Sequence, residues 1–370
     1  MRLLFCIKAM NLPGGGAERV LADTVNGLAV RGHEIQVLSF DRSGGRSFYA
    51  LDRRIERLEL GIGQTDRPAT ALETLRRIIA MRRVVVTVRP DVAVGFMHSM
   101  FIPLGLALIG SGVPVVASEH IVPEHYRTRP MQWALLRATP LFVRRLVCVS
   151  PEVRETYPAA LRRRMTVIRN AVALPVSGRA DVVGPARKTL LSVGRLEPQK
   201  DHMTLVRAFA MLQVEHPDWD LVILGDGSLR SELEALVADQ GLAGRVRLPG
   251  AIRDISSAYV CAQLYVQPSR YESQGLSTAE ALAHGVPAVG FRDCPGTNKV
   301  IRDGVNGALA EEGQDRALTL AGALRPLMAR PDLRRAMSAE ALKSVADNQL
   351  DPILDAWEAL LSGVARPGIS

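Results

Sequence analysis

Apolar and polar positions alternate along the first half of the chain in two distinct patterns. Residues 3–7 form a continuous apolar run, which predicts a buried strand, and residues 17–31 carry apolar side chains at helical spacing, which predicts a helix that Gly32 ends. Parallel strands joined by a helix need cover on both faces, and near-continuous apolar strands agree with this. The pattern continues with strands over residues 34–40, 92–96, 113–118 and 146–150 and a helix over residues 72–88.

The second half repeats the pattern after a break. Residues 171–188 gather proline, glycine and small polar side chains without periodicity, which is typical of a linker. Strands are then predicted over residues 190–193, 221–224, 264–267 and 287–291, with helices over residues 203–214 and 229–239. We therefore predict an α/β protein with two doubly wound, Rossmann-like domains: residues 1–172, a linker at 173–187, residues 188–350, and a final helix in residues 351–370 that packs back on the first domain.

Three features bear on location. Residues 100–117 carry no charge and approach the length of a membrane span, but prolines and glycines divide them into a short helix, a turn and a strand. The N-terminus reaches Lys8 after too few apolar residues for a signal peptide. The four cysteines show no CxxC spacing, so neither disulfides nor a zinc site is expected. Together these features predict a cytoplasmic protein.

The net charge of +8 implies an acidic partner or surface. A nucleic acid is not favoured, because the arginines occur in separated pairs, aromatic residues are few and no nucleic-acid-binding motif is present. Residues 126–145 mix five arginines with apolar side chains, which suits an anionic membrane surface. An ordinary half-buried helix with a solvated basic face explains the same stretch equally well.

Candidate chemistry lies where predicted strands end, because ligands of open α/β sheets bind beyond the carboxyl ends of the strands. Gly15 and Gly16 open a helix whose free N–H groups attract an anion, although a glycine turn needs no ligand. Gly194, Arg195 and Lys200 follow the first strand of the second half, and the two cations suit the two phosphates of a nucleotide diphosphate. A solvated basic loop is the plainer alternative.

The segment from Glu272 to Glu280 combines a carboxylate with a helix start. Gly275 allows a tight turn, and the amides of Gly275, Leu276 and Ser277 would then face a phosphate while Glu272 accepts sugar hydroxyls. Ser277 and Glu280 have the spacing of a capping box, which gives Glu280 a purely structural explanation.

Two further positions follow from the same search. His120 comes after strand 113–118 and is a candidate for contacting the donor sugar or the reacting centre, although a lone histidine is more often structural. Asp218 and Asp220 mimic a metal-binding DxD, but they lie at the entry of strand 221–224, opposite the ligand edge. We interpret them as a turn.

Four segments together resemble a known family. They are GGGAERV at residues 14–20, SVGRLEPQKDH at 192–202, LGDG at 224–227 and ESQGLSTAEALAHGVPAVGF at 272–291. In this combination the chain resembles, over nearly its whole length, the retaining family-4 glycosyltransferases of GT-B fold. Within that family it is most similar to enzymes that assemble polysaccharides and polyprenyl-diphosphate-linked glycans.

The resemblance implies roles for individual residues. Glu272 would hold hydroxyls of the donor sugar, with His120 near that sugar. Arg195 and Lys200 would neutralise the leaving diphosphate, and these four residues form the predicted catalytic set. The predicted donor-binding set is Gly15, Gly16, Gly194, Arg195, Lys200, Gly225, Gly275, Leu276, Ser277 and Glu280, with Glu280 on the ribose.

The resemblance further implies transfer of a hexose or N-acetylhexosamine from a nucleotide diphosphate sugar, preferably a UDP-sugar, with retention of anomeric configuration. The acceptor would be a glycan or a lipid-linked sugar held between the two domains, at the cytoplasmic face of the inner membrane. A donor phosphate oxygen would take the acceptor's proton, so no protein nucleophile, metal or other cofactor is required. Lys299 departs from the family, in which glutamate is common at this position.

Three other functions compete with this interpretation. A nucleotide-sugar 2-epimerase would use the same fold but needs an acid and a base carboxylate, which the sequence does not reveal. A dehydrogenase lacks its GxGxxG fingerprint after the first strand. An inactive GT-B scaffold subunit would not need Arg195, Lys200, Glu272 and Glu280 together.

Overall fold

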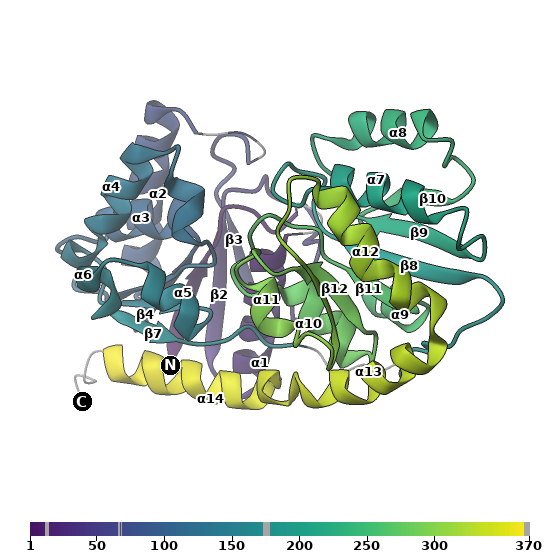
Figure 1. The fold of residues 1–370 in the computed structure, drawn as a ribbon. Coiled ribbons are helices and arrows are strands. Elements are labelled where there is room, and N and C mark those ends of the chain that lie inside the picture. Colours follow the sequence, from purple (N-terminus) through teal and green to yellow (C-terminus); the bar gives the residue numbers. More distant parts are fainter. Residues whose placement is uncertain (12–14, 66, 68, 173–177, 366–370) are drawn as a thin grey trace. The chain divides into compact units, whose positions relative to one another are not determined.

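The computed structural model describes residues 1–11, 15–65, 67, 69–172 and 178–365, and it divides into two compact units (Figure 1). Unit 1 comprises Met1–Ala171 and Leu350–Ser370, and unit 2 comprises Val172–Gln349. Part of the expected linker, residues 173–177, lies outside the described residues.

Unit 1 is built on a seven-stranded sheet in which every paired strand is parallel, in the order β3-β2-β1-β4-β5-β6-β7. The chain order reverses between β1 and β4. The elements are β1 (Arg2–Cys6), α1 (Gly16–Val30), β2 (Glu34–Ser39), β3 (Glu56–Glu59), α2 (Ala71–Val88), β4 (Val92–Phe96), α3 (His98–Ala107), β5 (Val115–Ser118), α4 (Pro130–Arg137), β6 (Arg145–Cys148), α5 (Pro151–Thr156), α6 (Ala159–Arg162), β7 (Met165–Val167) and α14 (Leu350–Val364), with 3-10 turns at Pro123–Tyr126 and Thr139–Leu141.

Unit 2 is built on a six-stranded parallel sheet in the order β10-β9-β8-β11-β12-β13, which reverses between β8 and β11. The elements are β8 (Lys188–Val193), α7 (His202–Leu212), β9 (Trp219–Leu224), α8 (Arg230–Asp239), β10 (Val246–Gly250), α9 (Ile255–Val260), β11 (Leu264–Val266), α10 (Leu276–Ala283), β12 (Ala288–Phe291), α11 (Thr297–Val300), β13 (Gly307–Ala310), α12 (Arg316–Ala329) and α13 (Pro331–Lys343), with a 3-10 turn at Ala346–Asn348. The two sheets confirm the predicted fold class.

The apolar stretch at residues 100–117 is a helix, a turn and a strand. It contains most of α3, a turn with Gly110 at φ 74°, and the start of β5. None of the described helices is long and apolar enough to cross a bilayer.

The last helix, α14, packs against α1 and the core of unit 1. Trp357 is buried and packs against the rings of Phe5 and Phe96, with ring centroids 6.3 and 6.1 Å away. Gly27 of α1 has no room for a side chain, because an added Cβ would lie 2.5 Å from Leu354 Cδ1. At the end of this helix pair, Arg31 binds the α14 carboxylates. The helix is therefore an integral part of unit 1.

Candidate functional site

The reversal of strand order in unit 2 brings together the loops that follow β8 and β11. Ligands of doubly wound sheets bind at such a reversal, beyond the carboxyl ends of the strands. The loop after β8 carries Gly194, Arg195 and Lys200, and the loop after β11 carries Glu272.

Glu272 is held by three hydrogen-bond donors. Its Oε1 lies 2.6 Å from Lys200 Nζ, 2.6 Å from Ser269 Oγ and 3.1 Å from Gln267 Nε2. The Lys200 and Glu272 side chains are only 15% and 11% exposed. Because an ammonium has three N–H donors, its bond to Glu272 leaves donors for a second anion. The pair thus combines a fixed carboxylate with a cation that can still bind a ligand.

The Gln267 amide orients this cluster. Its Oε1 accepts from the Tyr265 hydroxyl and, at 2.9 Å, from Ser277 Oγ, while its Nε2 donates to Ser269 and Glu272. All four hydrogen-bonding positions of the amide are therefore used, which fixes its rotation. Neither Gln267 nor Tyr265 was singled out in the sequence, because a side-chain network across a strand and a helix leaves no short motif.

The start of α10 differs from the sequence expectation. The N-cap is Gly275, at φ 69°, and no side chain caps it. Ser277 therefore lies inside the first turn and bonds Gln267, while Glu280 lies one turn further on. The predicted capping box of Ser277 and Glu280 is wrong, because the helix begins too early for Ser277 to be its cap. The first amides of α10, beginning at Leu276, are left without a side-chain acceptor, which suits an anion.

Glu280 is instead bound by the hydroxyl of a buried tyrosine. It is 4% exposed, and its Oε2 accepts from the hydroxyl of Tyr259 at 3.0 Å. The same hydroxyl lies 3.1 Å from the carbonyl oxygen of Ser277. A tyrosine that is itself fully buried therefore helps to position this carboxylate.

Glycines allow the loops of unit 2 to approach one another closely. Gly225 follows β9 at φ 146°, and a Cβ there would lie 2.0 Å from the carbonyl oxygen of Gly194. Next to Gly194, Arg195 is exposed, and among the described residues its side chain has no hydrogen-bonding or ionic partner. The guanidinium is therefore free to bind an anion.

The loop after β12 supports Glu272 through the backbone. The Glu272 N–H donates to the carbonyl of Pro295 at 2.8 Å, and a Cβ at Gly296 would lie 2.4 Å from the carbonyl oxygen of Glu272. Lys299 lies in α11, after this loop, and is exposed.

In unit 1, Gly15 is the N-cap of α1 and Gly16 its first residue, again without a side-chain cap. The carboxylate of Glu18 lies beside Gly15, where a Cβ would come within 1.8 Å of its Oε2. An acid in the first turn stabilises a helix but repels a phosphate. The role of these glycines in phosphate binding stays a prediction.

His120 follows β5 and is half-buried. Its Nε2 lies 2.8 Å from Ser118 Oγ, and its ring stacks on Phe96 with centroids 5.1 Å apart. Burial lowers the pKa of His120 to about 4, so the ring is neutral at pH 7. It can therefore serve as a hydrogen-bonding group in neutral solution, but not as a cation.

Glu119 was not selected as a candidate from the sequence. It is fully buried, accepts from the Tyr126 hydroxyl at 2.8 Å and from the Ile121 N–H at 3.1 Å, and lies next to His120. Burial raises the pKa of its carboxyl to about 7 despite these hydrogen bonds. An apolar strand before Glu119 was the only available signal of its burial.

The DxD-like pair is structural. Asp218 binds Lys188 at 2.6 Å in the turn before β9, as expected. Asp220 lies within β9 rather than in a turn, and binds Arg187 and Arg245. Within the described part of the chain, no group of three histidine, cysteine or acidic side chains is placed to hold a metal. Independence from a metal remains a prediction.

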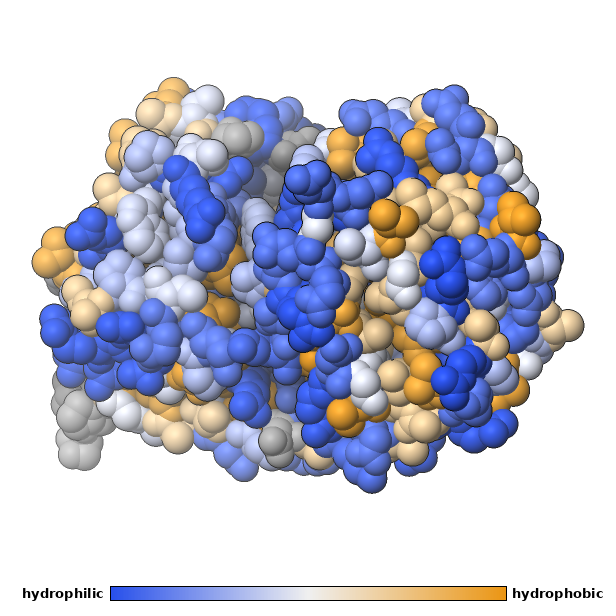
Figure 2. Space-filling view, viewed as in Figure 1, coloured by the Kyte–Doolittle hydropathy of each residue, from blue (hydrophilic) through white to orange (hydrophobic). Residues whose placement is uncertain are grey.

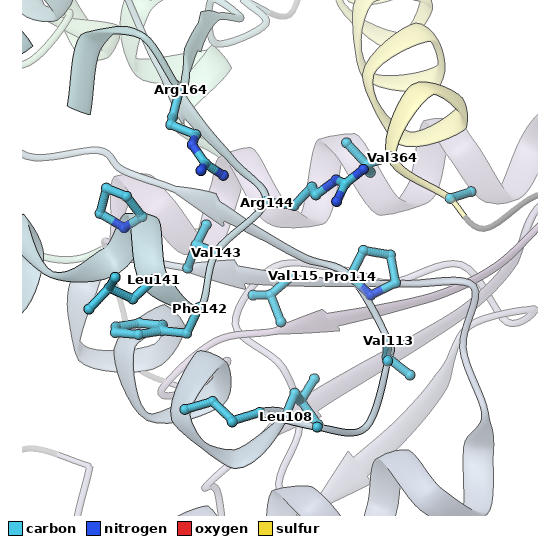
Figure 3. Close-up of a pocket in the computed structure, with 15 residues that line it drawn as sticks. Leu108, Val113, Pro114, Val115, Leu141, Phe142, Val143, Arg144, Arg164 and Val364 are labelled. Atoms are coloured by element: carbon cyan, nitrogen blue, oxygen red, sulfur yellow. The ribbon is translucent and has the colours of Figure 1, made fainter. Parts of the chain in front are cut away.

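A cavity of about 620 Å³ lies elsewhere, at the amino ends of β5 and β6 in unit 1 (Figure 3). Its lining is mainly aliphatic, and Figure 3 shows Arg144 reaching toward Val364 of α14, with Arg164 nearby. It is at the opposite edge of the sheet from the residues that follow the strands, so it is separate from the predicted chemistry.

Both halves of the chain match known protein families. Residues 14–174 match the model of Glycosyltransferase Family 4, and residues 181–344 match that of Glycosyl transferases group 1. A Campylobacter jejuni relative, GalNAc-α-(1→4)-GalNAc-α-(1→3)-diNAcBac-PP-undecaprenol α-1,4-N-acetyl-D-galactosaminyltransferase, is 25% identical over 98% of this chain and 99% of its own length.

Two solved structures share the whole fold. Sucrose-phosphate synthase from Thermosynechococcus elongatus has a TM-score of 0.83 and 18% identity, and HepE of Anabaena, solved in complex with UDP and glucose, has a TM-score of 0.80 and 20% identity. Each comparison covers 98% of this chain and 99% of the other. With two parallel sheets of this order and a family match in each half, the chain belongs to the glycosyltransferases of GT-B fold, with a family-4 domain followed by a group-1 domain.

Proposed function

We propose that this glycosyltransferase moves a hexose or N-acetylhexosamine from a UDP-sugar to a glycan or lipid-linked sugar, with retention of anomeric configuration. The observation that carries the proposal is the cluster at the β8/β11 reversal. It joins the Lys200–Glu272 pair, the unpaired Arg195 guanidinium and the uncapped start of α10.

Each group has a separate part in the donor site. Arg195, the remaining donors of Lys200 and the amides of α10 bind the diphosphate, while the Glu272 carboxylate accepts hydroxyls of the sugar. Glu280 accepts the ribose hydroxyls. The transition state separates an oxocarbenium-like sugar from a leaving diphosphate, so fixed cations beside the phosphates stabilise it more than they stabilise the ground state.

The catalytic step needs no protein nucleophile. The acceptor oxygen forms its bond to the anomeric carbon on the face from which the diphosphate departs, and a phosphate oxygen takes the acceptor's proton. The neutral His120 of unit 1 contributes a hydrogen bond to the sugar and not a charge. No metal is required, because Arg195 and Lys200 supply the positive charge.

The relatives favour the donor and acceptor classes named here. The HepE structure contains UDP and glucose, and the Campylobacter jejuni relative has a PP-undecaprenol-linked acceptor in its name. With a lipid-linked acceptor the enzyme would work at a membrane surface, and we propose peripheral contact with the cytoplasmic face of the inner membrane.

Nucleotide binding tests the donor site directly. Calorimetry with UDP, GDP and ADP on the wild type should show one preferred nucleotide, which we expect to be UDP. Arg195→Ala and Lys200→Ala should each weaken that binding by about 1–3 kcal/mol, because each removes a charged contact to the diphosphate. Arg335→Ala and Lys343→Ala, which change exposed cations of α13 in the same unit, are matched controls and should bind as the wild type does.

The outcomes separate the competing functions. If no nucleotide binds to a folded protein, alone or with a glycan acceptor, the inactive scaffold is the better interpretation. If UDP binds and a UDP-sugar is epimerised without an acceptor, the epimerase is correct. Equal losses of nucleotide affinity in Arg195→Ala and Arg335→Ala would reject the proposed contact between Arg195 and the diphosphate.

A further inference from the structure

The positive charge of the chain is concentrated in one segment. Residues 71–150 contain ten arginines and four acidic residues, a net charge of +6 within a chain whose total is +8. This segment forms α2, α3 and α4 of unit 1 with the strands between them. The remaining 290 residues are close to neutral, so the charge belongs to one part of one unit.

The acids of this segment do not neutralise its surface. Glu73 is used by the capping box of Thr70 and by Arg67, Asp91 accepts from the Arg2 N–H, and Glu119 is buried, so of the four acids only the half-buried Glu124 stands against the arginines of the surface. Among the described residues, none of the ion pairs involves an arginine of α2 or α4. The exposed guanidinium groups therefore keep their full charge.

The same helices expose aliphatic side chains. Leu72, Leu75, Ile79 and Val86 follow one another on α2 at intervals of three, four and seven residues, so they lie on one face of the helix. They are 45–60% exposed. Arg76 and Arg83 are exposed beside this stripe. Of fifteen large hydrophobic side chains that are exposed in the described structure, nine lie between residues 72 and 141.

The helices form one continuous layer. Arg82 of α2 donates to the carbonyls of Ala107 and Ile109 at the end of α3, at 2.8 and 2.9 Å. Gly105 of α3 lies against Phe142, just after α4, so α3 sits between its neighbours (Figure 1). Figure 2 shows hydrophobic side chains exposed beside hydrophilic ones on this side of unit 1. We call the exposed side chains of α2, α3, α4 and Thr139–Leu141 the basic–apolar face.

We propose that the basic–apolar face docks on the surface of an anionic lipid bilayer. Aliphatic side chains enter the headgroup region, and the arginines beside them extend toward lipid phosphates while their stems remain in apolar surroundings. A second copy of the chain is a poor occupant, because it would bring another set of exposed arginines against the first. The face also borders the 620 Å³ cavity, since Ile109 and Leu141 belong to both.

This proposal extends the sequence hypothesis for residues 126–145. That stretch supplies α4 and Leu141, but the longest apolar stripe is on α2. The inference rests on the proposed function in one respect: the lipid-linked acceptor would lie in the membrane to which this face binds. Vesicle binding requires neither nucleotide nor acceptor, so it can succeed or fail independently of donor binding.

The test is co-sedimentation of the full chain with vesicles of phosphatidylcholine, with and without 30% phosphatidylglycerol, at low and high salt. We expect binding to the anionic vesicles that weakens with salt. Arg76→Glu/Arg83→Glu should weaken it at least tenfold, since each arginine near an anionic surface contributes about fivefold. Leu75→Ser/Ile79→Ser should weaken it at both salt concentrations.

Matched controls are available in unit 2. Arg247→Glu/Arg335→Glu makes the same charge change at exposed positions, and Met211→Ser/Val214→Ser removes exposed apolar side chains. Both should bind vesicles as the wild type does, and UDP calorimetry and thermal melting should be unchanged in the α2 variants. The proposal is overturned if the wild type shows no preference for anionic vesicles, or if the α2 variants bind no worse than their controls. A wild-type dimer that the α2 substitutions dissociate, without vesicle binding, would assign the face to a second copy instead.

Discussion

Tyr259 and Glu280 show how one buried hydroxyl sets the position of a carboxylate. The phenol has no solvent contact and donates to the carboxylate that we assign to the ribose. Removal of the hydroxyl leaves the ring packing intact but takes one hydrogen-bond donor away from the carboxylate. Tyr259 is therefore a positioning residue in the proposed donor site.

Tyr259→Phe should weaken UDP binding by about 1 kcal/mol, since one buried hydrogen bond is lost and the donor must reorder Glu280. Calorimetry of the variant measures this change. Tyr49→Phe in unit 1 alters a tyrosine outside the site and serves as the control. Unchanged UDP affinity in a folded Tyr259→Phe protein would show that Glu280 keeps its position without the phenol.

Glu119 predicts a dependence of stability on pH. Because burial raises the pKa of this carboxyl from 4.5 to about 7 in the folded protein, folding favours the protonated form. Its contribution to stability is therefore fully present below the unfolded pKa and is lost as the pH rises to about 7. Across that interval the loss is roughly 3 kcal/mol.

Urea unfolding of the wild type and of Glu119→Gln, between pH 4.5 and 8, measures this effect. Glutamine does not titrate, and its single carbonyl oxygen can still accept from the Ile121 N–H while its NH2 group donates to the Tyr126 oxygen. The free energy of unfolding of Glu119→Gln, relative to that of the wild type, should increase as the pH rises. Glu124→Gln, a half-exposed position nearby in sequence, should show no such trend. Parallel pH profiles of wild type and Glu119→Gln would contradict the assigned protonation.

At the scale of elements, the sequence predicted every internal strand and no edge strand. The four strands that were not predicted, β3, β10, β7 and β13, are the outer strands of the two sheets. An internal strand is buried on both faces and has a continuous apolar run, as in β4. An edge strand such as β3, with sequence ERLE, is short and polar and lacks that signal.

The attachment of α14 to unit 1 depends on packing more than on charge. Trp357→Ala should lower the free energy of unfolding of unit 1 by about 3–5 kcal/mol, because it leaves a cavity beside Phe5 and Phe96. Arg31→Ala should cost no more than about 1 kcal/mol, since two of its carboxylate partners are largely exposed. Urea denaturation of both variants shows whether packing or ion pairing contributes more to the attachment of α14. Leu350→Ala is an exposed control on the same helix. A larger loss in Arg31→Ala would show that the ion pairs hold the helix.

For the whole molecule, the sequence motifs identified residues that the fold brings together, but not what holds them. Lys200 and Glu272 are 72 positions apart and form an ion pair because β8 and β11 are neighbours in the sheet. Gln267 and Tyr259 belong to no short motif, since their importance depends on which strand and helix meet. Likewise, the composition reveals the net charge of the chain, but only the structure shows that α2 and α4, which carry many of these arginines, lie in one helical layer on either side of the uncharged α3.

The return of α14 makes unit 2 an insertion within unit 1. During synthesis from the N-terminus, the ribosome completes every residue of unit 2 before it makes Trp357. Until then, Phe5 and Phe96 lack the indole that covers them in the finished protein. Unit 2 can thus reach its native core while the chain is still growing, whereas the first unit to begin is the last to be finished.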